Sequence, residues 1–319
     1  MPIQTVSIVI PVFNSADGLH LLVERIEKAI SLTALNAEVI LVNDGSRDQS
    51  WSRITEASSR NPRIRGINLM RNYGQHNAVL CGIRAACHET IVTMDDDLQN
   101  PPEEIPKLLQ LLDEGYDVAY GTPEHEQHGF WRDLASKVTK LALQNAMGAE
   151  TARRVSAFRA FRTQLRAAFA NYCGAFVSID VLLTWATTRF TAVPVRHDAR
   201  RYGESAYTFM RLLIHALNMM TGFSVVPLQA ASWIGFLSTV FGVIVFGWVV
   251  GRFLIQGGSV PGFTFLAAII AIFSGAQLFA LGVIGEYLAR MHFRIMDKPA
   301  YVIRETIAIT SGIPAGPNG

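Results

Sequence analysis

The sequence predicts an α/β protein in which a mostly parallel sheet is followed by helices at and in a membrane. Over the first hundred residues, β-branched runs alternate with stretches of helical spacing, an order typical of parallel strands joined by helices. Polar motifs follow several of the expected strands, and parallel sheets bind ligands at such strand ends. The last third contains long apolar runs without a charged residue.

The N-terminal elements follow from two periodicities. The run Val6–Val12 is rich in β-branched residues, as expected for a strand buried on both faces. The stretch Asp17–Ser31 places leucine, valine and isoleucine at helical spacing. The same reasoning predicts further strands at Glu38–Val42, Ile64–Leu69 and Thr90–Met94, and further helices at Asp48–Ser59 and Gln75–Ala86.

Residues 121–200 carry weaker signals. Short apolar runs there suit either a strand or a buried helix, so the assignments rest on length and composition. We expect helices at Gly129–Ala146, Leu165–Tyr172 and Ile179–Thr187, and strands at Val155–Phe161 and Ala192–Arg196.

The apolar runs Leu228–Val250 and Phe263–Ile284 are each long enough to cross a bilayer as a helix, which takes about 20 residues. A buried helical hairpin in a soluble protein is the alternative. Basic residues flank the outer ends of the pair, whereas the connection between the runs carries only Arg252. The positive-inside rule then places both termini in the cytoplasm. The preceding segment, Tyr207–Ser224, has one broad apolar face and suits a helix in the membrane interface or a core helix.

The cysteine content and the N-terminal residues argue against a disulfide-rich protein and against an N-terminal signal peptide. The chain has only 3 cysteines, without metal-ligand spacing, which argues against a disulfide framework. Its first apolar run contains Pro11 and has no basic residues before it, so a signal peptide is not expected.

The acidic run Asp95–Asp97 follows a buried strand and is the strongest chemical motif. Three adjacent carboxylates repel one another, so they favour a bound cation or many hydrogen-bond donors. On an extended chain Asp95 and Asp97 would point the same way, with Gln99 as a further oxygen ligand. Mg²⁺ or Mn²⁺ would suit such a site. A solvated acidic turn is the alternative.

Other polar residues suit phosphate or nucleoside recognition. Asp44 follows a strand and can accept hydrogen bonds from a ribose or base, although Asp-Gly is also ordinary turn chemistry. Arg71 can meet a phosphate. Arg132 and the segment Arg200–Ser205 offer cations and small donors near the membrane. For each of these arginines, attraction to anionic lipid headgroups is an equal alternative.

Together these motifs resemble the family 2 glycosyltransferases that act on polyprenyl phosphates. The similarity spans nearly the whole chain. It rests on residues 7–14 (SIVIPVFN), 42–46 (VNDGS), 72–76 (NYGQH), 95–106 (DDDLQNPPEEIP), 203–205 (GES) and 282–287 (GVIGEY). The sequence departs from the family pattern just before Arg159, where it reads RRVSAF, and at Ala206, where relatives tend to have lysine. These departures leave the sugar open.

The resemblance implies a GT-A fold and an inverting, metal-assisted transfer of a sugar from a nucleotide to a polyprenyl phosphate such as undecaprenyl phosphate. It assigns the nucleoside to Pro11, Val12, Asn14 and Asp44, the metal and diphosphate to Asp95, Asp97 and Gln99, and the donor and acceptor phosphates to Arg132, Arg200 and Ser205. It also implies a homotetramer in contact with membrane lipid, with no nucleic-acid partner.

The expected organisation is a cytoplasmic catalytic domain at 1–206, the interfacial helix at 207–224, a transmembrane hairpin at 225–288 and a cytoplasmic tail at 289–319, all at the inner membrane. A lipid phosphate is already anionic at neutral pH, so it needs no general base to attack the sugar. Alternatives are another lipid or glycan acceptor, or an inactive membrane scaffold of the same fold. A processive synthase is disfavoured because the sequence contains no Arg-Trp pair.

Overall fold

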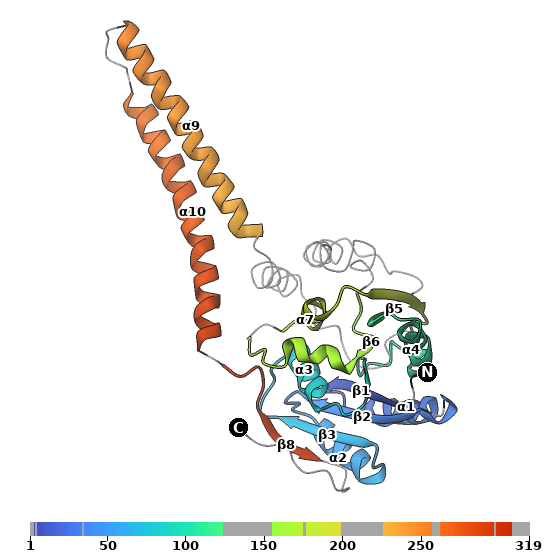
Figure 1. Ribbon diagram of the computed structural model, residues 1–319. Helices are drawn as coiled ribbons and strands as arrows, with labels where there is room; N and C mark the ends of the chain where they lie inside the picture. Colours follow the sequence, from blue (N-terminus) through green and yellow to red (C-terminus); the bar gives the residue numbers. More distant parts are fainter. Residues whose placement is uncertain are drawn as a thin grey trace. The chain divides into compact units, whose positions relative to one another are not determined.

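The computed structural model describes residues 3, 5–33, 35–123, 155–174, 177–198, 226–256, 262–296 and 298–307 (Figure 1). The chain forms two compact units. One comprises Met1–Phe209 together with Lys298–Gly319, and the other comprises Met210–Asp297. The C-terminal segment therefore returns to the unit in which the chain begins.

The first unit is built on a mixed, mostly parallel sheet, with strand order β7-β5-β6-β4-β1-β2-β3-β8 in the described residues. Parallel pairs join β1 to β2 and β4, β2 to β3, and β5 to β7. Antiparallel pairs place β6 between β4 and β5, and β8 beside β3. The strands are β1 (Thr5–Val12), β2 (Asn36–Asn43), β3 (Ile64–Leu69), β4 (Thr90–Thr93), β5 (Val118–Pro123), β6 (Arg159–Arg162), β7 (Phe190–Val195) and β8 (Ile303–Ile307).

Helices cover both faces of this sheet. Alternate residues of the central strand β1 point to opposite sides, and nearly all of them are buried, so both sides need a covering layer. On one face, Ile8 and Ile10 of β1 share a core with Leu22 of α1 (Leu19–Thr33) and Leu108 of α4 (Ile105–Asp113). On the other face, Val9 lies so close to α3 (Gln75–Ala85) that a Cβ on Gly82 would lie 2.3 Å from the Cγ1 atom of Val9. Among the described residues, this unit also contains the helices α2 (Ser50–Arg60), η1 (Pro102–Glu104), η2 (Thr163–Phe169) and α7 (Ile179–Ala186).

The expected alternation of strands and helices is present over the first hundred residues, with small shifts at the ends of elements. Further along, the expected strand Val155–Phe161 begins only at Arg159, and the expected helix Leu165–Tyr172 is instead the 3-10 helix η2. The C-terminal residues that we expected to be a tail include β8. The helix expected at Gly129–Ala146 lies outside the described residues.

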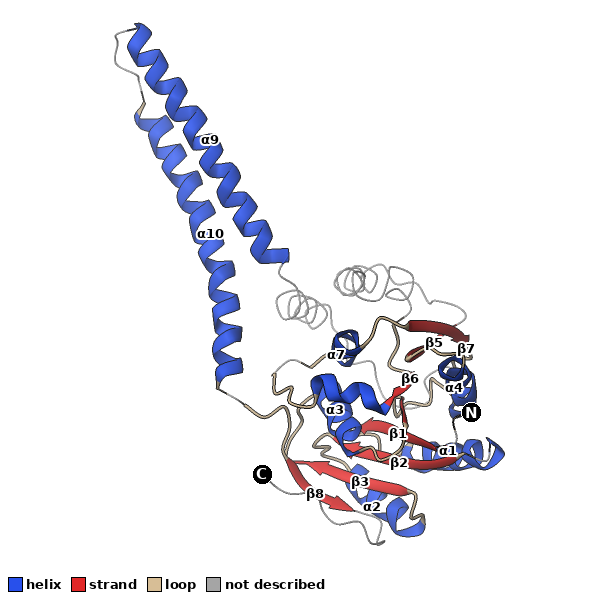
Figure 2. Ribbon diagram, viewed as in Figure 1, coloured by secondary structure: helices blue, strands red, loops and turns tan. Residues whose placement is uncertain are grey.

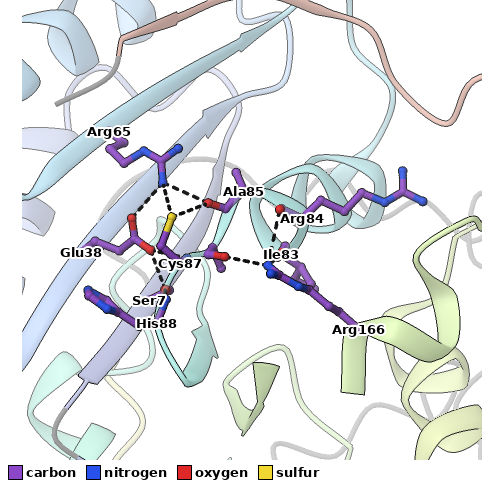
Figure 3. A network of polar contacts seen from close by, with 10 residues as sticks. Ser7, Glu38, Arg65, Ile83, Arg84, Ala85, Cys87, His88 and Arg166 are labelled. Atoms are coloured by element: carbon purple, nitrogen blue, oxygen red, sulfur yellow. Dashed lines mark hydrogen bonds and ion pairs between the residues drawn. The ribbon is translucent and has the colours of Figure 1, made fainter. Parts of the chain in front are cut away.

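A buried carboxylate ties the amino ends of the strands together (Figure 3). Glu38 accepts hydrogen bonds from the Ser7 hydroxyl at 2.6 Å, the Cys87 backbone N–H at 2.7 Å and the Arg65 guanidinium at 2.9 Å. Burial acts to raise the pKa of Glu38, but these partners outweigh it, and the pKa is lowered. Beside this group, Arg166 donates to carbonyl oxygens at the C-terminus of α3. This network fixes the end of the sheet opposite the polar loops.

The second unit contains α9 (Val226–Gln256) and α10 (Phe263–Ile295), which pack side by side (Figure 2). A Cβ on Gly242 would lie 2.8 Å from the ring of Phe273, so this glycine lets the two helices approach closely. The segments Pro227–Arg252 and Ile272–Ala289 are long and apolar enough to cross a membrane, and an 18-residue apolar window in each has no buried residue. The interfacial helix expected at 207–224 lies outside the described residues.

Candidate active site

Loops at the carboxyl ends of β1, β2 and β4 meet at one edge of the sheet, because these strands are parallel neighbours. Hydrogen bonds connect the loops directly. The Asn14 N–H donates to the Ser46 hydroxyl at 3.0 Å, and the Ser15 hydroxyl donates to Asp96 at 2.6 Å. The loop between β3 and α3 joins them through Gln75, whose amide donates to Asp95 at 2.6 Å. The predicted motifs that follow β1, β2, β3 and β4 therefore form one polar cluster.

Asp44 connects the loop after β2 to the loop before α3. Its two carboxylate oxygens accept the backbone N–H groups of Tyr73 at 2.7 Å and Gly74 at 2.9 Å. The residue is only 2% exposed, and this burial raises the pKa of its carboxyl, although the two N–H groups and the charge of Arg71 partly offset the rise. Both oxygens already accept backbone N–H groups, so Asp44 fixes the shape of these loops.

Gly45 allows the same two loops to touch. Its φ of +65° lies in the left-handed region, and a Cβ there would lie 2.4 Å from the carbonyl carbon of Arg71 and 2.5 Å from the backbone nitrogen of Asn72. The guanidinium of Arg71 stacks over the ring of Tyr73 at 4.2 Å. The arginine is thereby held beside the Asp44 carboxylate, where its charge would also reach an approaching phosphate.

At the end of β1, fewer side chains are accessible to a ligand than the sequence predicted. The side chains of Pro11 and Val12 are buried, and the Val12 carbonyl accepts the Asp44 N–H at 2.9 Å. Asn14 is exposed, has a φ of +53°, and its side-chain oxygen accepts the Arg47 N–H at 2.9 Å. A nucleoside contact from Pro11 or Val12 would have to come from the backbone, whereas Phe13 and Asn14 expose their side chains.

The acidic run does not continue as an extended chain. A turn begins at Asp96, and Leu98 has a φ of +60°, so strand alternation alone does not set the directions of Asp95 and Asp97. Asp96 is committed to the first loop, since it accepts from the Ser15 hydroxyl and from the Phe13 N–H at 3.4 Å. Burial raises the pKa of Asp96. The hydrogen bonds from Ser15 and Phe13 oppose this rise, and the negative charge of Asp97 adds to it.

Asp95 and Asp97 remain the candidate metal ligands. The Asp97 carboxylate accepts the Gln99 N–H at 3.1 Å, and the backbone carbonyl of Gln99 accepts the Asp198 N–H at 2.8 Å. In the part of the chain that the structure describes, no three His, Cys, Asp or Glu side chains gather to hold a metal ion. A cation bound by two carboxylates would need further oxygen ligands, and the phosphates of a bound nucleotide supply these. The all-oxygen set fits Mg²⁺ or Mn²⁺.

A cavity of about 230 Å³ adjoins Asp95. Its wall includes Gln75, His76, Thr93, Ser156, Arg159 and Asp180. Arg159 and Asp180 form a buried ion pair, Asp180 also accepts the Tyr120 hydroxyl at 3.0 Å, and Arg159 donates to the Thr93 hydroxyl at 3.1 Å. This pair was not predicted from the sequence. The only sign of it is that Arg159 and Asp180 are each a charged residue within a short apolar run.

Three predicted site residues, Arg132, Arg200 and Ser205, lie outside the described residues. Pro11 and Val12 are the last two residues of β1. The other predicted site residues lie in the loops at the carboxyl edge of the sheet, namely Asn14, Asp44, Arg71, Asp95, Asp97 and Gln99.

Residues 7–170 match the family described as glycosyl transferase family 2. This match covers most of β1, the strands β2 to β6, the acidic run and the loops of the polar cluster. The chain belongs to glycosyl transferase family 2.

Two similar proteins carry the same name, undecaprenyl-phosphate 4-deoxy-4-formamido-L-arabinose transferase. The protein of Klebsiella pneumoniae (strain 342) is 33% identical over 310 residues, which cover 96% of this chain and 94% of the relative. The protein of Pectobacterium carotovorum subsp. carotovorum (strain PC1) is 33% identical over 309 residues, with the same coverage.

Solved structures confirm the expected GT-A fold. Glucosyl-3-phosphoglycerate synthase from Mycobacterium tuberculosis, in complex with Mn²⁺, uridine diphosphate and glucosyl-3-phosphoglycerate, superposes with a TM-score of 0.50 at 16% identity, covering 68% of this chain and 78% of that chain. Mannosyl-3-phosphoglycerate synthase from Rubrobacter xylanophilus gives a TM-score of 0.50 at 16% identity, covering 68% and 72%. At such identities the likeness concerns the fold.

Proposed function

We propose that this protein transfers a sugar from a nucleotide to the phosphate of a polyprenyl lipid, with undecaprenyl phosphate as the acceptor, at the cytoplasmic face of the inner membrane. The observation that carries the proposal is the extent of the similarity to the undecaprenyl-phosphate transferases. The 33% identity runs over 96% of the chain, so it includes α9 and α10 as well as the nucleotide-binding loops. An acceptor that lies in a membrane explains why one chain combines the two units.

The proposed reaction needs no proton removal from the acceptor. An oxygen of the lipid phosphate attacks C1 of the sugar, the bond from C1 to the nucleoside diphosphate breaks, and the diphosphate leaves with the electron pair. Attack opposite the leaving group inverts the configuration at C1. Because both reactants are anions, the site must bring negative charges together and stabilise the departing diphosphate. Asp44, Asn14 and Arg71 are the residues we propose for the nucleoside end of the donor.

A divalent cation held by Asp95 and Asp97, with Gln99 beside them, would neutralise the diphosphate. The all-oxygen ligand set near the strand ends supports Mg²⁺ or Mn²⁺. The Mn²⁺ and uridine diphosphate in the mycobacterial synthase of the same fold also favour a divalent metal beside the nucleotide.

The acceptor side of the site is proposed from the sequence. Arg132, Arg200 and Ser205 would bind phosphate oxygens of donor and acceptor. Their place in the chain supports this, since Arg200 and Ser205 come shortly before the helical unit. We propose a multi-pass membrane protein with a cytoplasmic catalytic domain at 1–206, an interfacial helix at 207–224, a transmembrane hairpin at 225–288 and a cytoplasmic tail at 289–319. We also propose that it assembles as a homotetramer.

The test is transfer in vitro. Membranes containing the full-length protein are incubated with undecaprenyl phosphate, Mn²⁺ and a panel of nucleotide sugars, and the lipid product is weighed by mass spectrometry. We expect one donor to give a glycosylated undecaprenyl phosphate. Absence of a lipid product with every donor would refute the proposed function, and a product on another lipid would reassign the acceptor.

Asp97→Ala tests the metal site in the same assay. We expect turnover to fall by about 10²-fold or more, because the leaving diphosphate loses its counter-charge. Asp113→Ala, which removes an exposed carboxylate at the end of α4, is the control and should keep wild-type turnover. Near-wild-type activity of Asp97→Ala would rule out its role in metal binding.

A further inference from the structure

A row of polar side chains crosses the sheet from the nucleotide-binding loops to the C-terminal strand. Asn43, the last residue of β2, lies directly opposite Asn68 on β3, and Asn68 lies directly opposite Glu305 on β8. Side chains at directly opposite positions project on the same face of a sheet and can interact. The three residues therefore form a ladder perpendicular to the strands.

Hydrogen bonds along this ladder run in one direction. The backbone N–H of Ser46 donates to the Asn43 side-chain oxygen at 3.4 Å. The Asn43 amide nitrogen donates to the Asn68 oxygen at 2.8 Å, and the Asn68 nitrogen donates to a carboxylate oxygen of Glu305 at 2.9 Å. Each amide accepts on one side and donates on the other, and the chain ends on a carboxylate that only accepts.

The two amides lie in the interior, whereas Glu305 is at the surface. Asn43 is 2% exposed and Asn68 is 7% exposed. A buried amide that loses its partner either stays unsatisfied or turns to find another. Removal of the Glu305 acceptor would therefore release Asn68, and through it Asn43, from a fixed orientation.

We propose that Glu305 is a positioning residue for the nucleoside-binding loop 43–46. Asn43 opens this loop, and the Ser46 hydroxyl accepts the backbone N–H of Asn14, so the ladder reaches two of the loops that would contact the nucleotide. A residue that follows the membrane hairpin in the chain thus sets the geometry of the loop that follows β2. The inference rests on the proposed nucleotide-sugar donor.

The pairing of β8 with β3 does not depend on the Glu305 side chain. The Met70 N–H donates to the Val302 carbonyl at 2.9 Å, and the Arg304 guanidinium donates to the Met70 carbonyl at 3.2 Å. Tyr301, just before the strand, lies near the guanidinium of Arg84. Substitution of Glu305 should therefore break the ladder and leave the strand in place.

The experiment uses full-length protein in detergent with Mn²⁺. The Kd is measured for UDP, GDP, CDP and ADP, and then KM for the donor, KM for undecaprenyl phosphate and kcat. Glu305→Ala removes the acceptor, and Glu305→Gln keeps a side-chain oxygen in its place. Thr306→Ala is the control, since Thr306 is exposed on the same strand and projects on the opposite face.

We expect Glu305→Ala to raise the nucleotide Kd and the donor KM about 3- to 10-fold, the effect of losing one hydrogen bond of typical strength. The acceptor KM and kcat should stay within about 2-fold, because the ladder ends at the nucleoside loop. Glu305→Gln should restore most of the affinity, and Thr306→Ala should match the wild type. If Glu305→Ala is poorly folded, Glu305→Asp takes its place, with the same expected rise because its carboxylate falls short of Asn68.

The proposal is overturned if nucleotide affinity is unchanged in Glu305→Ala, if Thr306→Ala weakens it equally, if glutamine is no better than alanine, or if the acceptor KM shifts as much as the donor KM. A wild type that binds a nucleotide but forms no glycolipid refutes the proposed function, and the ladder is then judged on nucleotide affinity. A wild type that binds none of the four nucleotides overturns both.

Discussion

The buried pair between Arg159 and Asp180 makes a strong prediction for stability. Their side chains are 3% and 11% exposed, and Asp180 also accepts the hydroxyl of Tyr120, which is fully buried. Replacing Asp180 with alanine leaves the guanidinium charge buried without a counter-ion, which costs about 3–5 kcal/mol. Because the Tyr120 hydroxyl loses its acceptor at the same time, we expect the upper part of that range. For a domain of this size, such a loss lowers the melting temperature by about 8–20 °C.

The buried Cys81 in α3 allows unfolding of the first unit, which contains the sheet, to be measured by thiol labelling. Burial raises the pKa of its thiol to about 12, so the folded protein protects it from thiol reagents. Cys87 and Cys173 are exposed, and a Cys87→Ser/Cys173→Ser background removes their signal. Labelling of Cys81 during a temperature ramp then reports the opening of the unit around α3 for wild type and for Asp180→Ala.

Two controls separate a buried charge from a general loss of an ion pair. Glu56→Ala removes exposed pairs with Arg53 and Arg60, which are worth under about 1 kcal/mol, so its labelling curve should stay near that of the parent. The double variant Arg159→Met/Asp180→Leu removes both charges and should recover much of the lost stability. A melting shift for Asp180→Ala as small as that of Glu56→Ala, or a double variant no better than the single one, would refute this reasoning.

Three further predictions concern the loops, the amino end of the sheet and the metal. Gly45→Ala should destabilise the protein by about 1–3 kcal/mol and raise the donor KM, because the new Cβ would overlap the Arg71 backbone. Thermal unfolding measures the stability and donor titration measures the KM, and unchanged values would contradict the close approach of the two loops. The pKa of Glu38 is lowered from 4.5, so its contribution to stability is present above that pH and is lost as the pH falls through the folded-state pKa. Glu38→Gln should therefore be less stable at pH 7 and lose less on acidification, and an acid-unfolding curve parallel to that of wild type would count against it. Chelation with EDTA should abolish sugar transfer and added Mn²⁺ or Mg²⁺ should restore it, whereas full activity in EDTA would exclude a metal at Asp95 and Asp97.

The sequence predicted those parts of the fold that depend on local pattern. The β-branched run of β1 predicts a strand that is buried on both faces, as observed. Asp44 and Asp95 come within two residues of the ends of β2 and β4, so predicting these strands also located the two carboxylates. The parallel order then brings the loops together without further information.

Features set by long-range pairing or by local backbone turns could not be predicted. The strand β8 is short and mostly exposed, and its partner lies far away in the chain, so its own residues give no sign of it. The pairing of Arg159 with Asp180 depends on how α7 meets β6. A turn that begins at Asp96 and the positive φ of Leu98 end the extended geometry predicted for the acidic run.

The position of β8 at the sheet edge also constrains synthesis of the protein. Glu305 follows its partner Asn68 by 237 residues, and at typical rates of translation the ribosome needs about 10 to 50 s to make that length. During this interval α9 and α10 emerge while the outer edge of β3 still has unpaired backbone groups. The sheet can therefore be completed only after the apolar hairpin has been made, so a ribosome that stalls within the hairpin leaves a nascent chain with an open, aggregation-prone strand.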